Sequence, residues 1–224
     1  PQTGGDDFFP GTAAQQLADY LFAAHLGGRS VSDVFRWCSN ERDTSPADIL
    51  SEYPRYAGIA SRVSSVIALT PETRSGVFGS LQTMVAFLAD PEIIDWIDPH
   101  RDTNGNIDER RGLFDPYEFA TSEDTLYLLS AQGRPSTALT ASLTAVVAFT
   151  AFQRAQPEFT GNNRRLPVPL CCVLDEAANI CRWAELADVY SYFGSAGIPI
   201  MTIWQNPDQG RAAFGETNFG SLFN

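Results

Sequence analysis

The sequence predicts a mixed α/β protein in two parts, an all-helical domain over residues 1–111 and a parallel sheet with crossover helices over residues 112–224. Helix caps and helically spaced apolar residues recur through the first part. A polar, turn-rich stretch, residues 98–112, then interrupts the pattern. The second part holds three short apolar runs separated by helical segments, an order that gives parallel strands joined by crossover helices.

Cap signals place the helices of the first half. Thr12 can cap a first helix that ends at Gly27 and Gly28, and Ser30 or Ser32 can begin a second one. Proline after a capping residue marks the start of a helix, because its fixed φ suits the first turn. Further helices are therefore expected to begin at Ser45–Pro46, at Tyr56 (ending at Leu69), at Thr70–Pro71 (through Leu88) and at Asp90–Pro91.

The strands of the second half are predicted from three runs that contain almost only apolar residues. They span residues 126–129, 168–174 and 198–204, and each is short enough for a strand covered on both faces. Helical segments at residues 136–154 and 183–194 connect them. We therefore expect three parallel strands joined by two crossover helices.

The charge composition excludes several kinds of function. The chain has 27 acidic and 15 basic residues, and its formal net charge is −12 at pH 7. All 15 basic residues are arginine, so these residues contain neither a Schiff-base lysine nor the phosphate-binding lysine of a P-loop. Both halves are acidic, which opposes nonspecific binding to nucleic acid or anionic membranes. No run approaches the roughly 20 apolar residues of a membrane span, so we expect no membrane-spanning segment in these residues.

One apolar run ends in two carboxylates. Leu170-Cys-Cys-Val-Leu174 is followed directly by Asp175 and Glu176. A buried strand brings both side chains to its carboxyl end, where α/β sheets bind ligands. In nucleotide hydrolases of the P-loop class, an aspartate at this place holds Mg²⁺ and the following glutamate polarises the attacking water. Taken alone the pattern is weak, and two acids that begin the next turn are the alternative.

The residues that follow make the pattern more specific. Asp175-Glu-Ala-Ala-Asn-Ile180 is followed by Glu185-Leu186 within a helix, and then by Gly197-Ile-Pro-Ile-Met-Thr-Ile-Trp-Gln205. This order resembles the type IV secretion coupling proteins, the TraG/TraD-type ATPases of conjugation. Phe214-Gly215-Glu216 stands where that family has an aromatic residue followed by glycine.

The resemblance extends over about residues 10–224. In the first half, Pro71–Gly76 and Phe114–Pro116 look like the end of the family's helical domain and the return to its ATPase sheet. The resemblance implies that residues 112–224 form part of a RecA-like nucleotide-binding domain, the half that carries the Walker B strand. The family's P-loop strand and membrane helices are not in these residues, so the chain is expected to be an internal fragment.

The resemblance also implies roles for three residues. Asp175 is expected to position Mg²⁺ through water, Glu176 to activate the attacking water, and Gln205 to sense the γ-phosphate of ATP. ATP and Mg²⁺ would be cofactors of the full-length protein. The fragment alone is expected to bind neither, to hold no metal and to be inactive, because half of the nucleotide site is missing.

The chain departs from the family at one arginine. Many relatives carry an arginine in the glycine-rich turn before the last strand, where this chain has Gly194-Ser-Ala-Gly197. This turn therefore does not supply the arginine that would act on the nucleotide of a neighbouring subunit. Arg74 and Arg134 are the alternatives, although each also fits a surface or capping role.

The function implied by the resemblance is that of a membrane-anchored ring, a homo-hexamer on the cytoplasmic face of the membrane. It would hydrolyse ATP to drive single-stranded DNA, with its attached relaxase, into the channel of a type IV secretion system. The fragment itself is expected to be soluble, as a monomer or as a dimer paired through a sheet edge.

Two alternatives remain open from the sequence. The chain could be a nucleotide-independent module that binds basic accessory or relaxase proteins, with the helical domain receiving the substrate, since acidic charge suits a basic partner. It could also belong to a related ring translocase that pumps DNA. That class shares the strand ending in Asp-Glu but does not predict a helical domain between the P-loop and that strand.

Overall fold

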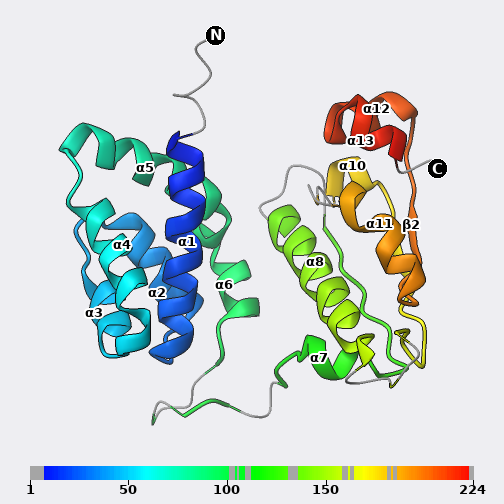
Figure 1. Cartoon of the computed structure of the whole chain (residues 1–224), viewed down its shortest axis with the longest axis horizontal. Helices are drawn as coiled ribbons and strands as arrows, with labels where there is room; N and C mark the ends of the chain where they lie inside the picture. The colour runs from blue at the N-terminus through cyan, green and yellow to red at the C-terminus, as the bar shows by residue number, and fades with distance from the viewer. Residues whose placement is uncertain are drawn as a thin grey trace. The chain divides into compact units, whose positions relative to one another are not determined.

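The structure is a computed structural model that describes residues 8–100, 104, 106–108, 112–130, 136–157, 161, 164–180, 183 and 186–221. The chain divides into two compact units, Pro1–Arg111 and Gly112–Asn224. Figure 1 shows the first as a bundle of helices and the second as helices beside extended chain.

The regular elements described in the first unit are helices, apart from an isolated bridge at Ile107. Its elements, in chain order, are α1 (Phe8–Leu26), α2 (Val31–Ser39), α3 (Ser45–Ser51), the 3₁₀-helix η1 (Pro54–Tyr56), α4 (Ala57–Ile67), α5 (Pro71–Met84), the 3₁₀-helix η2 (Ala86–Ala89) and α6 (Pro91–Ile97).

Local capping chemistry sets several of these boundaries. Ser30 and Asp33 form a capping box at the start of α2, and the side chain of Asp90 accepts the N–H of Glu92 at the start of α6, so both predicted caps are confirmed. The prediction at Thr12 is wrong, because α1 already begins at Phe8. Pro10 does not prevent this start, since the N–H groups of a first turn have no partner within the helix. Ser45 is the first residue of α3 and not its cap.

The core of the first unit forms around α1, which packs against α2, α3 and α5. Tyr20 meets Trp37 edge-on, with ring centroids 6.0 Å apart, and both side chains are fully buried. An ion pair lies beside this core: Arg62 binds the Asp19 carboxylate with two N–H groups, at 2.6 and 2.7 Å, and the Asp19 side chain is only 4% exposed. Bidentate geometry of this kind compensates for part of the cost of burying a carboxylate.

The second unit combines helices with a small sheet. Its elements are α7 (Pro116–Phe119), α8 (Ser136–Arg154), β1 (Cys172–Leu174), α10 (Ala177–Ile180), α11 (Leu186–Ser195), β2 (Ile200–Thr202), α12 (Pro207–Phe214) and α13 (Glu216–Ser221). The predicted helix over residues 136–154 is confirmed, and α11 lies within the predicted 183–194 segment except for its last residue.

The two strands pair in parallel, as predicted for the runs 168–174 and 198–204. Val173 lies opposite Met201, and α11 makes the crossover between the strands. Backbone hydrogen bonds extend the pairing beyond both strands, from Leu170 N–H to Gly197 O (3.0 Å) and from Ala177 N–H to Ile203 O (3.2 Å). The mixed α/β class is thus observed, and among the described residues the sheet contains two strands.

The third predicted strand is not observed. Residues 126–129 are extended but belong to no strand. Their side chains do alternate, with Tyr127 80% and Leu129 88% exposed while Leu126 and Leu128 are half-buried. The strand prediction is therefore wrong: the side chains alternate as in a strand, but a strand also needs backbone hydrogen bonds to a neighbour.

Helix α8 corrects the expectation that no segment could span a membrane. By length and composition this 19-residue helix could cross one. In the structure its Ala148 and Ala151 are buried in the core of the second unit, and the ring of Phe149 lies 5.5 Å from that of Phe193 on α11. Helix α8 therefore packs one face against the core of the second unit.

Candidate functional site

The carboxyl ends of the two parallel strands bring the three predicted site residues together. Asp175 and Glu176 follow β1 directly, and Gln205 follows β2 after Ile203 and Trp204. The Ile203 N–H donates to Leu174 O at 2.9 Å, so the segments that follow β1 and β2 leave the sheet side by side. Ends of adjacent parallel strands are where α/β sheets place ligand-binding side chains.

Glu176 and Gln205 are in direct contact. Gln205 Nε2 donates to Glu176 Oε1 at 2.7 Å, which joins residues 29 positions apart in the sequence. Asp175 makes a different contact: its Oδ1 accepts the backbone N–H of Glu176 at 3.0 Å. Asp175 and Gln205 are exposed and Glu176 is half-buried, so all three can be reached from solvent.

The backbone at Glu176 has a left-handed conformation, with φ at 48°. Residues other than glycine, asparagine and aspartate seldom adopt this region. The turn directs the chain from β1 straight into α10, where Ala177 and Ala178 are buried and the helix packs on α8 and α12. Glu176 is a candidate functional residue, and the packing of α10 holds its backbone in this strained conformation.

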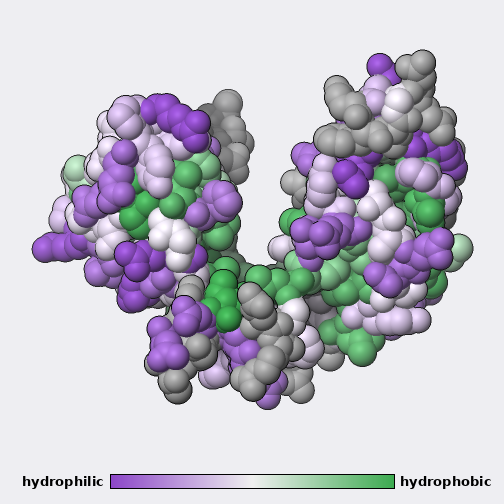
Figure 2. Space-filling view, turned by 90° about the horizontal axis from the view of Figure 1, so that it is seen from below, coloured by the Kyte–Doolittle hydropathy of each residue, from purple (hydrophilic) through white to green (hydrophobic). Residues whose placement is uncertain are grey.

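A groove of about 500 Å³ ends at Asp175. Its walls are the extended chain after α7, residues of α8 that include Thr140 and Val147, and the segment 168–175. Glu176 and Gln205 do not line it, so Asp175 is the member of the three predicted site residues that belongs to the groove. Apolar side chains also reach the surface elsewhere in this unit, among them Met201 and Ile203, and Figure 2 shows hydrophobic residues at the surface in green.

The carboxylates at the strand ends do not form a metal-binding cluster by themselves. Within the described parts of the chain, no group of three or more histidine, cysteine, aspartate or glutamate side chains could hold a metal ion. Mg²⁺ needs less from the protein, because it keeps several waters and takes one or two carboxylates plus substrate phosphates. The exposed carboxylate of Asp175 fits that requirement.

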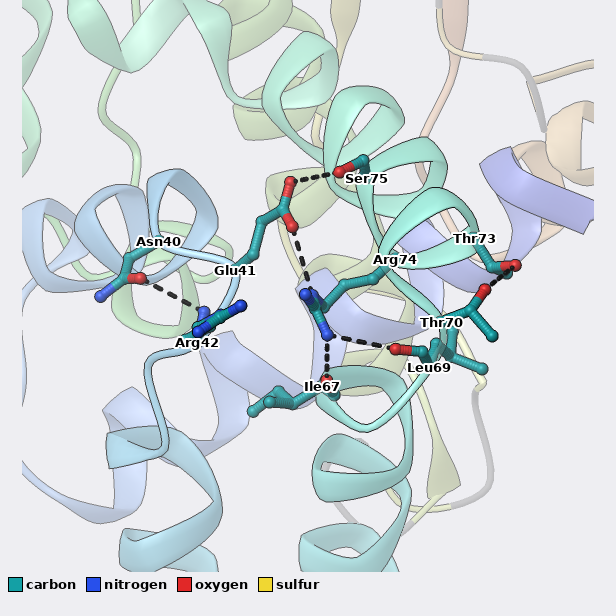
Figure 3. Close-up of polar contacts among 9 residues, drawn as sticks. All are labelled: Asn40, Glu41, Arg42, Ile67, Leu69, Thr70, Thr73, Arg74 and Ser75. Atoms are coloured by element: carbon teal, nitrogen blue, oxygen red, sulfur yellow. Dashed lines mark hydrogen bonds and ion pairs between the residues drawn. The ribbon is translucent and has the colours of Figure 1, made fainter.

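Arg74 is engaged within the helical unit, and Figure 3 shows its partners. Its Nη1 donates to the carbonyl oxygens of Ile67 (2.9 Å) and Leu69 (3.1 Å) at the end of α4, and its Nε pairs with Glu41 at 3.2 Å. The side chain is 11% exposed. Arg74 thus has the capping role that the sequence left open, and its guanidinium is not available to a neighbouring subunit. Arg134 lies outside the described residues.

One residue of this site was missed by the sequence analysis. Gln209 Nε2 donates to Gln205 Oε1 at 3.2 Å, from a position four residues further along the chain. The spacing of four residues was the available signal. It was overlooked because α12 was not predicted as a helix.

A comparison with known families matches residues 169–224 to the family described as "TraM recognition site of TraD and TraG". The matched segment contains both strands and all three predicted site residues. No curated protein and no solved structure matches the chain. The match lies entirely in the second unit, so the resemblance noted for the first half stays a prediction.

The matched description concerns the recognition of TraM by TraD and TraG. The order of residues from Asp175 to Gln205, which carried the resemblance, lies wholly within the matched segment. Residues 169–224 are therefore similar to the TraM recognition site of the TraG/TraD type of coupling protein, which supports the resemblance for this part of the chain.

Proposed function

We propose that the chain works in conjugation as part of a coupling ATPase that recognises a protein partner and drives single-stranded DNA into a type IV secretion channel. The observation that carries this proposal is the contact between Glu176 and Gln205, inside the segment matched to TraD and TraG. In this proposal the whole protein is a membrane-anchored homo-hexamer on the cytoplasmic face. The 224 residues contain no lysine, so the P-loop lysine has to come from outside them.

Each site residue has a task that suits its contacts. One oxygen of Asp175 is oriented by the Glu176 N–H, and its carboxylate would hold Mg²⁺ through water. Mg²⁺ neutralises developing charge on the phosphates when it is bound. One oxygen of Glu176 accepts from Gln205, which leaves the other to orient an attacking water and take its proton. Gln205 would respond to the γ-phosphate from the end of β2.

The ATPase arm is tested by Glu176→Gln in the complete protein that supplies the P-loop lysine. The substitution keeps the shape of the side chain but removes the base, so DNA-stimulated ATP hydrolysis should fall by about 100-fold or more while ATP still binds. Glu118→Gln, the same change at an exposed position on α7, is the matched control and should keep the wild-type rate. Wild-type hydrolysis by Glu176→Gln would refute the assigned role.

A second candidate function is recognition of a basic partner without nucleotide, and the surface of α12 and α13 favours it. The matched segment has six acidic residues against two arginines. Asp208 and Glu216 are 91% and 81% exposed, and both pair with Arg211, at 2.9 and 3.3 Å. The two carboxylates outnumber the single cation, so this surface suits a basic TraM-type or relaxase protein.

Titration calorimetry with a TraM-type protein of the same conjugation system tests this second function. Asp208→Asn and Glu216→Gln together should weaken binding by roughly fivefold, and the loss should shrink as salt rises. Asp188→Asn, an exposed change on α11, is the control and should bind as the wild type does. A binding affinity that changes neither with salt nor with the α12–α13 substitutions would contradict a contact at this surface.

A further inference from the structure

Three side chains form a line of hydrogen bonds from the end of β1 to helix α12. Gln209 donates to Gln205 Oε1 at 3.2 Å, and Gln205 donates to Glu176 Oε1 at 2.7 Å. The first member belongs to α12, the second follows β2 and the third follows β1. The line therefore connects the two strand ends to one helix.

The chemistry of the three groups fixes the direction of this line. An ionised Glu176 can only accept, so the part of the Gln205 amide that faces it has to be the NH₂ group. The Gln205 carbonyl oxygen then faces the other way and requires a donor. Gln209 supplies that donor through its own NH₂ group. With Gln209 in place, the Gln205 amide cannot turn over without losing both hydrogen bonds.

Helix α12 holds Gln209 in the position from which it donates. Asn206 caps the helix and accepts the Gln209 backbone N–H at 3.0 Å. The helix is in turn fixed to the end of β2, because the Trp204 ring meets those of Phe214 and Phe219 edge-on, each at 5.5 Å. Gln209 thus reaches Gln205 from a helix that packs against the end of β2.

We propose that Gln209 is a positioning residue that sets the orientation of the Gln205 amide and, through it, of the Glu176 carboxylate. The proposal rests on the ATPase function proposed above. Gln209 does not touch the reacting atoms in this scheme. It keeps the Gln205 NH₂ group on Glu176, so that the carboxylate presents its other oxygen to the water.

The hydrogen bonds are tested on the 224-residue chain, independently of any ATPase activity. Gln209→Glu replaces the donor by an acceptor of the same shape, so the Gln205 amide has an acceptor on each side and loses one of its two hydrogen bonds; its side-chain NH₂ resonances should therefore shift in a ¹⁵N NMR spectrum. Glu176→Gln combined with Gln209→Glu reverses the whole line and should restore an ordered Gln205 amide. Gln153→Glu, the identical change at an exposed position on α8, should leave the Gln205 resonances unchanged.

The catalytic consequence is tested in the complete protein. Gln209→Glu and Gln209→Ala should lower kcat about fivefold with KM for ATP unchanged, the rate equivalent of one hydrogen bond. Gln209→Asn, whose amide is one methylene too short to reach Gln205, should resemble the alanine variant. Gln153→Glu should keep the wild-type kcat.

The outcomes separate this proposal from the proposed function. Unshifted Gln205 resonances in Gln209→Glu would overturn the line of hydrogen bonds. A wild-type kcat in both Gln209→Glu and Gln209→Ala, while Glu176→Gln abolishes hydrolysis, would overturn the positioning role and leave the ATPase function standing. If Glu176→Gln also hydrolyses ATP normally, the proposed function fails, and the positioning role fails with it.

Discussion

Replacing Gly210 by alanine should destabilise the second unit, although this change usually stabilises a helix. Gly210 is buried within α12, where alanine is favoured over glycine by about 1 kcal/mol. A Cβ atom there would overlap the ring of Phe219, which is itself buried and packed edge-on against Trp204. Overpacking of a core costs about 1–3 kcal/mol, and after the gain of about 1 kcal/mol the free energy of unfolding should fall by up to about 2 kcal/mol.

Urea denaturation measures the change in the free energy of unfolding. Hydrogen exchange, followed on peptides from residues 204–221, shows whether the loss is local to α12 and α13. Gly194→Ala on α11 is the matched control, because nothing lies within 4 Å of its added Cβ, and it should be neutral or slightly stabilising. In a Phe219→Ala background the obstacle is gone, and Gly210→Ala should then stabilise by up to about 1 kcal/mol. A Gly210→Ala protein as stable as Gly194→Ala, with Phe219 present, would refute the reasoning.

Three further predictions concern the helical unit and are checked by chemical denaturation. Arg74→Met should cost about 2 kcal/mol, since two carbonyl oxygens at the end of α4 lose their donor, and full stability would contradict the capping role. Arg62→Met should cost about 3 kcal/mol by leaving the Asp19 carboxylate buried without a cation, and adding Asp19→Asn should recover most of it. Burial raises the pKa of Tyr20 and of Cys38 to about 12, so both groups ionise first in the unfolded chain and the free energy of unfolding should fall above about pH 9. Tyr20→Phe should reduce that loss. An alkaline stability profile that is the same in Tyr20→Phe as in the wild type would contradict this assignment.

Features that depend on neighbouring residues could be read from the sequence. The caps at Ser30 and Asp90 were found because the side chain and the N–H group it accepts are two or three residues apart. The meeting of Glu176 with Gln205 was foreseeable for a similar reason of geometry. Adjacent parallel strands end at the same edge, so residues that follow two such strands come together.

Features that depend on distant packing could not be read in this way. Helices α12 and α13 were missed, because α12 contains glycine and its position relies on Trp204, Phe214 and Phe219. The segment 126–129 has the side-chain alternation of a strand, but pattern alone does not say whether the edge of β1 comes within hydrogen-bonding distance. The contact of Gln209 was missed together with its helix.

The left-handed backbone at Glu176 would leave a signature in a saturation library of this position. Selected for folded protein alone, the library should be enriched in glycine, asparagine and aspartate, the residues that tolerate a φ of 48°. Selected for transfer of DNA between cells, it should retain glutamate. A position at which two selections favour different amino acids separates the demands of folding from those of chemistry.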